Sequence, residues 1–332
     1  MQDLAKGIHV KNSDFISPVK AQLDEFETAL EQKLNTKLPL AGKIVQYISG
    51  KRGKRLRPVL VFLTAGLHGV SNKVTLASGL VIELLHTATL IHDDVVDESD
   101  LRRGSPTVNS LWNSKISILV GDFIFSKSLT TMVEMQSIKA IDILGKAANE
   151  ITEGELLQMD HEYLGELSES VYFELITKKT ASLFSASCQL GALSITEDEL
   201  VLKRMHLLGE NMGIAFQITD DLLDYTGDVS KLGKPVGNDI KEQKITLPLI
   251  YALNKAESKI RTEILDRFEN VSNDEDIKYI IDFANDYGGV EHSRQTAKSF
   301  ADKATLVLSF YPDSAYKHSL IQLLNYSIDR DV

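Results

Sequence analysis

Apolar residues in this chain recur at spacings of three and four over long stretches, and this periodicity is what most constrains the fold. Alternating strand patterns and hairpin dipeptides are scarce. The pattern therefore predicts an all-α protein. The expected helices cover residues 18–35, 39–49, 57–68, 72–98, 107–135, 137–163, 168–193, 197–226, 245–270, 274–287 and 289–330, the last broken near Pro312.

Helix-end signals sharpen one of these assignments. Thr196 and Glu199 match a capping box, so we expect Thr196 to cap the 197–226 helix and Glu199 to reach back to the cap amide. Gly227 is a plausible stop for the same helix. The 72–98 helix should end in the polar segment that begins at Glu98.

Composition indicates a single globular domain over residues 1–332. The chain has 43% hydrophobic and 25% charged residues, with no linker, repeat or low-complexity segment. A net charge of -11 disfavours nonspecific nucleic-acid binding. The single cysteine, Cys188, excludes an intrachain disulfide and suits a reducing compartment. With no signal-like start and no uninterrupted run of about 18 apolar residues, we expect a cytoplasmic protein without a transmembrane segment.

Two copies of the pattern Asp-Asp-x-x-Asp lie at the ends of predicted apolar helices. Residues at i, i+1 and i+4 of a helix fall on one side, so each copy gathers three carboxylates. The helix dipole disfavours negative charge at these C-terminal ends, which makes sense chiefly if cations compensate. Oxygen-only ligands favour Mg²⁺ shared with a substrate diphosphate. A single copy could be a solvated acidic helix end, but two are harder to dismiss. The candidate metal ligands are Asp93, Asp94, Asp97, Asp220, Asp221 and Asp224.

Basic residues cluster in two places despite the acidic background. Five cations fall between Lys51 and Arg57, and Arg102 and Arg103 follow the first aspartate motif. Lys and Arg side chains near a metal site suit phosphate binding, although Arg102 and Arg103 could instead form a surface salt bridge. His86 lies two helical turns before Asp93 on the same face, where a satisfied core histidine is the plain alternative. Exposed lysines usually only solvate, which is how we interpret Lys178, Lys231 and Lys241.

These motifs resemble the trans-isoprenyl diphosphate synthases, or polyprenyl synthetase family, over most of the chain, and within it the long-chain, octaprenyl-type enzymes. The similar segments are Gly53 to Pro58, Glu83 to Asp97, Arg102 to Gly104, Gly154-Glu155, Lys179-Thr180, Phe216 to Asp221 and Gly233 to Asp239. The resemblance implies the isoprenoid synthase fold, with helices around a deep central cavity and three Mg²⁺ per active site. It also implies two substrates, isopentenyl diphosphate and an allylic prenyl diphosphate such as farnesyl or geranyl diphosphate.

The resemblance also implies a role for each candidate residue. Asp93, Asp97 and Asp220 would contact Mg²⁺ most directly, with Asp94, Asp221 and Asp224 completing or orienting the shell. The allylic diphosphate would be held by Arg102, Lys179, Lys234 and Lys244. Isopentenyl diphosphate would be held by Lys54, Arg57, His86 and Arg103. Thr180 and Gln217 would lie near the reacting carbons. The sequence offers no convincing nucleophilic triad, in keeping with ionisation of the allylic diphosphate and attack by the alkene.

Small residues on the first aspartate helix favour a long product. Ala88 and Thr89 stand where short-chain members tend to carry an aromatic side chain, while Leu85 and Phe123 could form a floor further along the cavity, or could be plain core. By this analogy the product is an all-trans chain of about C30 to C45, the length typical of quinone side chains.

Other interpretations remain open at this stage. A shorter-chain synthase of farnesyl or geranylgeranyl diphosphate would differ only in chain length. A class I terpene cyclase usually lacks the second aspartate motif and needs no second basic site. The chain could also be the catalytic subunit of a heteromeric synthase, a noncatalytic partner or, least in keeping with the motifs, an acidic helical scaffold. A symmetric homodimer is the expected assembly.

Overall fold

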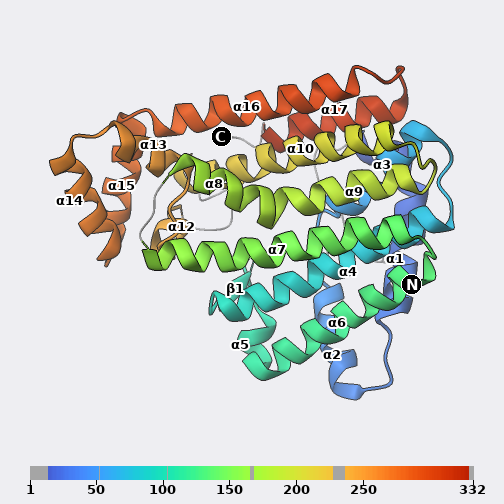
Figure 1. The fold of residues 1–332 in the computed structure, drawn as a ribbon. Coiled ribbons are helices and arrows are strands. Elements are labelled where there is room, and N and C mark those ends of the chain that lie inside the picture. The colour runs from blue at the N-terminus through green and yellow to red at the C-terminus, as the bar shows by residue number, and fades with distance from the viewer. Residues whose placement is uncertain (1–13, 52, 103, 165–167, 227–235, 329–332) are drawn as a thin grey trace. The chain divides into compact units, whose positions relative to one another are not determined.

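The computed structural model describes residues 14–51, 53–102, 104–164, 168–226 and 236–328, and it is almost entirely helical (Figure 1). The all-α prediction is therefore confirmed. The elements are η1 (Asp14–Val19), α1 (Lys20–Leu34), α2 (Pro39–Ser49), α3 (Leu56–His68), α4 (Lys73–Val96), β1 (Leu101–Arg102), β2 (Ser105–Pro106), α5 (Val108–Trp112), α6 (Ser114–Glu134), α7 (Ile138–Leu164), α8 (Glu169–Ile176), η2 (Thr177–Ala181), α9 (Ser182–Leu193), α10 (Glu199–Thr226), α12 (Asn238–Lys241), α13 (Leu247–Lys255), α14 (Ser258–Glu269), α15 (Asp274–Asp286), α16 (Gly289–Leu308) and α17 (Ala315–Ile328).

Three of the long predicted helices are interrupted. The 107–135 prediction is wrong near its start, because Asn113 has a positive φ of 101° and its side chain caps α6 by accepting from the Ile116 amide. A π-helical turn separates α8 from α9, and an extended Ala256 separates α13 from α14. The two-residue strands β1 and β2 and the short α12 were not expected from the sequence. Apolar periodicity continues through such breaks and therefore does not reveal them.

The predicted capping box at α10 is also wrong. The cap is Asp198, whose Oδ1 accepts from the amides of Leu200 (2.8 Å) and Val201 (3.5 Å). Glu199 instead pairs with Lys139, 2.8 Å away. A carboxylate directly before the first turn is the better acceptor for helix-end amides and has displaced the threonine from this role. The predicted stop at Gly227 lies outside the described residues.

Contacts within the chain divide it into two compact units. The first comprises residues 1–148, 183–206 and 309–323. Its centre is α4, which runs beside α6 and also packs on α3 and α1 (Figure 1). Residues 59–65 of α3 are buried, and so are residues 78–85 of α4. Asn72 and Thr75 form a reciprocal capping box at the start of α4, which fixes the register of the helix that carries the first aspartate motif.

Helices α4 and α6 are both long and apolar enough to cross a membrane by length and composition. In α4, 61% of the most apolar 18-residue stretch is buried, as expected for the core helix of a globular unit. In α6, only 33% of the corresponding 18-residue stretch is buried. Apolar side chains therefore remain exposed on α6.

The second unit comprises residues 149–182, 207–308 and 324–332. Its core joins the apolar faces of α8, α10, α13, α15 and α16, with Ile218, Leu222, Leu249 and Ile280 almost completely buried. Gly289 begins α16 where a Cβ would lie 1.9 Å from the Pro248 carbonyl oxygen, so α13 and α16 approach backbone to backbone. This packing fixes the end of α10, which carries the second aspartate motif.

Candidate active site

The first aspartate motif ends α4, as the sequence predicts. Asp93 and Asp94 lie in the last turn, and the amide of Asp97 donates to the Asp93 carbonyl at 2.8 Å. Asp94 is buried, and its Oδ1 accepts from Arg102 Nε at 2.6 Å. Burial raises the pKa of Asp94, and Arg102 opposes this rise. Asp93 and Asp97 keep accessible surface. The middle carboxylate of the motif is thus buried beside Arg102, while the outer two keep accessible surface.

The second aspartate motif, near the end of α10, also has one buried carboxylate and one exposed carboxylate. Asp220 is exposed, whereas Asp221 is buried. The Tyr172 hydroxyl donates to Asp221 Oδ2 at 2.6 Å, and Gln217 Nε2 donates to its Oδ1 at 2.8 Å. Burial raises the pKa of Asp221, and the two hydrogen bonds oppose this rise. Tyr172 was missed by sequence reasoning, since an aromatic residue in an apolar helix carries no signal of such a contact.

Thr180 and Gln217, each predicted to lie near the reacting carbons, are hydrogen-bonded to one another. The Thr180 hydroxyl donates to Gln217 Oε1 at 2.8 Å, so a hydrogen-bonded row runs from Thr180 through Gln217 to Asp221. Because Gln217 uses its carbonyl toward Thr180 and its NH₂ toward Asp221, the orientation of its amide is fixed. Thr180 stands on the π-helical turn at Thr177–Ala181, a distortion often found at functional positions.

Lys178 and Lys179, which have different predicted roles, both pair with glutamates of α7. Lys179 lies on the same turn, where its Nζ is 2.8 Å from Glu155 and donates to Gln158 at 3.0 Å. Lys178, interpreted from the sequence as an exposed solvating lysine, has a side chain only 20% exposed and pairs with Glu153 at 2.7 Å, so that interpretation is wrong. Gly154 allows α7 to approach this turn, because a Cβ there would lie 3.0 Å from the Lys179 amide nitrogen. Lys179 is therefore held beside the row by acidic and amide groups of α7.

In the first unit, the cations of the basic cluster have different surroundings. Arg55 lies in a partly buried ion network with Glu27 at 2.9 Å and Glu83 at 2.5 Å, and these carboxylates raise its pKa against the effect of burial. Arg57 NH1 lies 3.0 Å from His86 Nε2. Because arginine can only donate, His86 accepts at Nε2 and is neutral, with its proton on Nδ1. Arg55 and Arg57 are neighbours in the sequence but differ in role: Arg55 is held in a structural ion network, whereas Arg57 remains a candidate substrate ligand.

The remaining candidate residues are placed as follows. Lys54 is exposed. Lys244 Nζ lies 3.0 Å from Glu242, and Asp224 accepts from two backbone amides of the segment that leads to Lys244. Ala88 and Leu85 are buried, whereas Thr89 and Phe123 keep accessible surface. Arg103 and Lys234 lie outside the described residues.

The accessible carboxylates suit a hard divalent cation. Among the described residues, no three His, Cys, Asp or Glu side chains are already gathered as a metal site. Asp94 and Asp221 are buried, whereas Asp93, Asp97 and Asp220 keep accessible surface. Asp93, Asp97 and Asp220 therefore have the oxygen chemistry to bind Mg²⁺ that keeps several of its waters and shares a substrate diphosphate.

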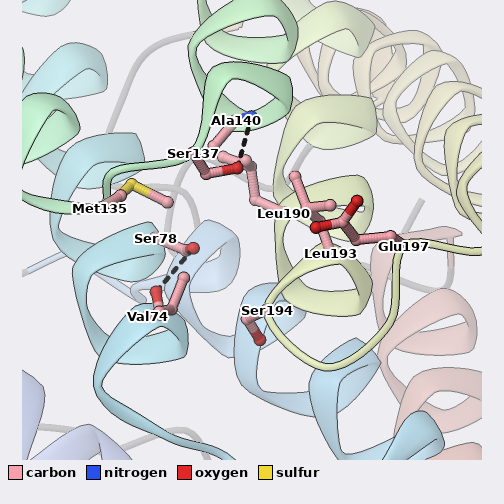
Figure 2. A pocket seen from close by; sticks show the side chains of 9 residues that line it. All are labelled: Val74, Ser78, Met135, Ser137, Ala140, Leu190, Leu193, Ser194 and Glu197. Carbon is pink, nitrogen blue, oxygen red and sulfur yellow. Dashed lines mark hydrogen bonds between the residues drawn. The ribbon is translucent and has the colours of Figure 1, made fainter.

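A pocket in the first unit lies away from this chemistry. Figure 2 shows it at the N-terminal end of α4, lined by Val74, Ser78, Met135, Ser137, Ala140, Leu190, Leu193, Ser194 and Glu197. The hydroxyls of Ser78 and Ser137 bond locally, to the Val74 carbonyl and the Ala140 amide. At 1.5 Å per residue, Val74 is about 28 Å along the helix from Asp93. The pocket therefore belongs to the opposite end of α4 from the aspartates.

Comparison with known proteins identifies close relatives. The sequence profile of the polyprenyl synthetase family matches residues 39–284. Octaprenyl diphosphate synthase of Escherichia coli K12 is 36% identical over 323 residues, covering 96% of this chain and 99% of that protein. A polyprenyl synthase of Caulobacter crescentus, solved with calcium and isoprenyl diphosphate, has a TM-score of 0.90 at 33% identity, covering 96% of this chain and 97% of its own.

A shorter-chain enzyme is nearly as similar. The geranylgeranyl pyrophosphate synthase of Bacteroides thetaiotaomicron has a TM-score of 0.82 at 35% identity, covering 95% of this chain and 98% of its own. The fold prediction is confirmed by these matches. Overall identity does not separate long from short products.

Proposed function

The chain belongs to the polyprenyl synthetase family, a family of metal-dependent prenyltransferases, and from this premise we propose that it makes a long-chain all-trans-polyprenyl diphosphate. It would condense isopentenyl diphosphate head-to-tail with an allylic diphosphate, farnesyl or geranyl diphosphate. The observation that carries the proposal is shared by the two motifs: Asp94 and Asp221 are buried, whereas Asp93 and Asp220 keep accessible surface. We also propose that residues 1–332 form one polyprenyl synthetase domain.

Each binding group has a role in this reaction. Bound Mg²⁺, three ions in our proposal, would neutralise the diphosphate that departs from the allylic carbon. Lys179, Arg102, Lys234 and Lys244 would hold that diphosphate, and the Thr180–Gln217 row would lie beside the reacting carbons. Lys54, Arg57, His86 and Arg103 would hold isopentenyl diphosphate. Since His86 is neutral, the positive charge of the pair comes from Arg57 alone. The alkene attacks the allylic cation, and the proton lost goes to the released diphosphate.

The assay that tests this function supplies purified protein with Mg²⁺, radiolabelled isopentenyl diphosphate and farnesyl diphosphate, and separates the dephosphorylated products by length. Products of C30 or longer would support the proposal, and we expect them to serve as quinone side chains. Products that stop at C15 or C20 would identify a shorter-chain synthase. A cyclised hydrocarbon would identify a terpene cyclase. If no product forms with the chain alone, catalysis requires another subunit or the chain does not catalyse this reaction.

Product length is expected to depend on Thr89 more than on Ala88. Thr89 keeps accessible surface on α4, so Thr89→Phe should place a ring in the path of the growing chain and shorten the main product to about C15–C20. Ala88 is 1% exposed, so a Phe there would overpack the first unit and cost about 1–3 kcal/mol of stability. Product chromatography and thermal unfolding measure the two effects.

The matched control is Thr262→Phe, at an exposed position of α14. It should leave both product length and turnover unchanged. An unaltered product distribution in an active Thr89→Phe enzyme would remove Thr89 from the product path. Leu85 and Phe123 would then be the next positions to change.

We further propose a cytoplasmic homodimer that forms through α6. Ile118, Leu119, Phe125, Leu129 and Val133 recur at helical spacing and are exposed on this helix, Leu119 by 59% and Val133 by 68%. A contiguous exposed apolar stripe of this kind is typical of a protein interface. A second copy of the same stripe would form a symmetric contact. The free, buried thiol of Cys188 is compatible with the cytoplasm.

The double variant Leu119→Glu and Leu129→Glu should shift the protein from twice the chain mass to 36.9 kDa in light scattering after gel filtration. Burying two carboxylates in an apolar contact without partners is strongly unfavourable. The control is Leu306→Glu on α16, a similarly exposed leucine at 65%. A dimer that survives the double change would place the interface elsewhere, and a monomeric wild type would refute the homodimer.

A further inference from the structure

Asp224 accepts hydrogen bonds from the backbone of the segment that follows α10, and we infer that Asp224 is a positioning residue for the segment 236–244 and not a metal ligand. This revises the metal role that the motif suggests for its third position. The inference rests on the proposed function for its kinetic consequences. Its structural basis lies entirely within the second unit.

Three consecutive backbone amides of the segment converge on this one residue. The Gly237 amide donates to the Asp224 carbonyl at 2.9 Å. The Asn238 amide donates to Oδ1 at 3.0 Å and the Asp239 amide to Oδ2 at 2.8 Å. Each carboxylate oxygen therefore accepts one backbone amide of the segment. Amide bonds to a carboxylate are charge-assisted and stronger than bonds between neutral groups, so they fix the entry into α12.

The opposite side of the segment is packed just as closely. Gly237 has a φ of +84°, and a Cβ there would lie 2.1 Å from Ile277 Cγ2 of α15. Ile240 is completely buried in the same core. The segment is thus held between Asp224 on α10 and the apolar face of α15. A shift of the turn would break the amide bonds or unpack Ile240.

The segment 236–244 ends at Lys244, a candidate ligand of the allylic diphosphate. The Lys244 amide donates to the Asp239 carbonyl at 2.8 Å, so the backbone of Lys244 is tied to the residue that Asp224 binds. Its side chain lies 3.0 Å from Glu242. In the proposed reaction Lys244 binds the allylic diphosphate. Loss of Asp224 should therefore weaken binding of that substrate more than binding of metal or isopentenyl diphosphate.

The test compares Asp224→Asn with Asp220→Asn, a change to the accessible aspartate four residues earlier. Hydrogen exchange of the peptide covering 236–244 should accelerate by about tenfold in Asp224→Asn and stay unchanged in Asp220→Asn. Mn²⁺ binding in the presence of inorganic diphosphate, followed by electron paramagnetic resonance, should weaken only in Asp220→Asn. Neither readout requires turnover, so both remain informative if the wild type makes no polyprenyl product.

Steady-state kinetics then test which of the two substrates depends on Asp224. The KM for the allylic diphosphate should rise about tenfold in Asp224→Asn and in Lys244→Gln, and the double variant should be no worse than the single ones because both changes remove the same contact. The KM for isopentenyl diphosphate should not change. Unchanged exchange together with weakened Mn²⁺ binding in Asp224→Asn would overturn the inference. If Asp224→Asn does not fold, Asp224→Glu, which keeps the charge but misplaces it, decides by the same three readouts.

Discussion

Replacing Asp93 or Asp220 by alanine is expected to lower kcat/KM for isopentenyl diphosphate condensation by at least about a thousandfold, while the protein stays folded. Both side chains keep accessible surface, one at the end of α4 and the other at the end of α10. In our proposal they bind the cations that neutralise the departing diphosphate. Asp93 lies in the last turn of α4, where the helix dipole disfavours negative charge, so its removal should leave the thermal midpoint equal or slightly higher.

The matched control is Asp286→Ala, another exposed aspartate in the last turn of a helix, α15. It should retain wild-type kcat/KM. The measurement is product formation across a range of Mg²⁺ concentrations, with thermal unfolding on the same samples. An Asp220→Ala enzyme that is active within a factor of about ten would contradict the metal role, because losing a single electrostatic contact of this kind usually costs a hundredfold or more.

Substituting Gly191 by alanine should destabilise the protein by about 3 kcal/mol or more. The added Cβ would lie 2.1 Å from Thr64 Oγ1 and 2.3 Å from the Val61 carbonyl oxygen. The second contact is with backbone, so α9 would have to move away from α3. Thr64 itself donates to the Leu60 carbonyl at 2.7 Å and has no space to rotate without losing that bond.

Gly145→Ala is the control for this prediction. Gly145 lies in the exposed part of α7, where no described atom beyond its own helix turn would come within 4 Å of a Cβ. Alanine should stabilise that helix by up to about 1 kcal/mol. Chemical denaturation of the two variants measures both changes. Equal stability of Gly191→Ala and wild type would show that the α3–α9 contact is looser than the structure indicates.

The site illustrates how far motif reasoning reaches. The spacing of the aspartates predicted two carboxylate groups at helix ends, and both motifs lie there. It could not separate their members. Asp94 is set apart by Arg102, and Asp221 by Tyr172, which is 49 residues away in the sequence. Arg102 reaches Asp94 from the strand β1, whereas Tyr172 reaches Asp221 because α8 packs beside α10, and the aspartate spacing predicts neither contact.

The basic cluster shows the same limit. Its charge predicted a diphosphate site, and Arg57 lies 3.0 Å from His86, which the resemblance assigned to the same substrate. Its neighbour Arg55 turns instead to Glu27 and Glu83, because a left-handed backbone at φ 52° directs this residue toward α1 and α4. Two residues of the same type and similar sequence context therefore differ by one backbone conformation.

The sequence by itself determined the helical class, most helix ranges, and the identity of the chemical groups, because apolar periodicity and residue type are local properties. Only the tertiary structure decided the helix breaks at Asn113 and at the π-helical turn, and the use of Asp224 by the 236–244 segment. Those features arise from particular backbone conformations, hydrogen bonds and close packing. Their energies depend on distances of a few tenths of an ångström, which no pattern in one sequence encodes.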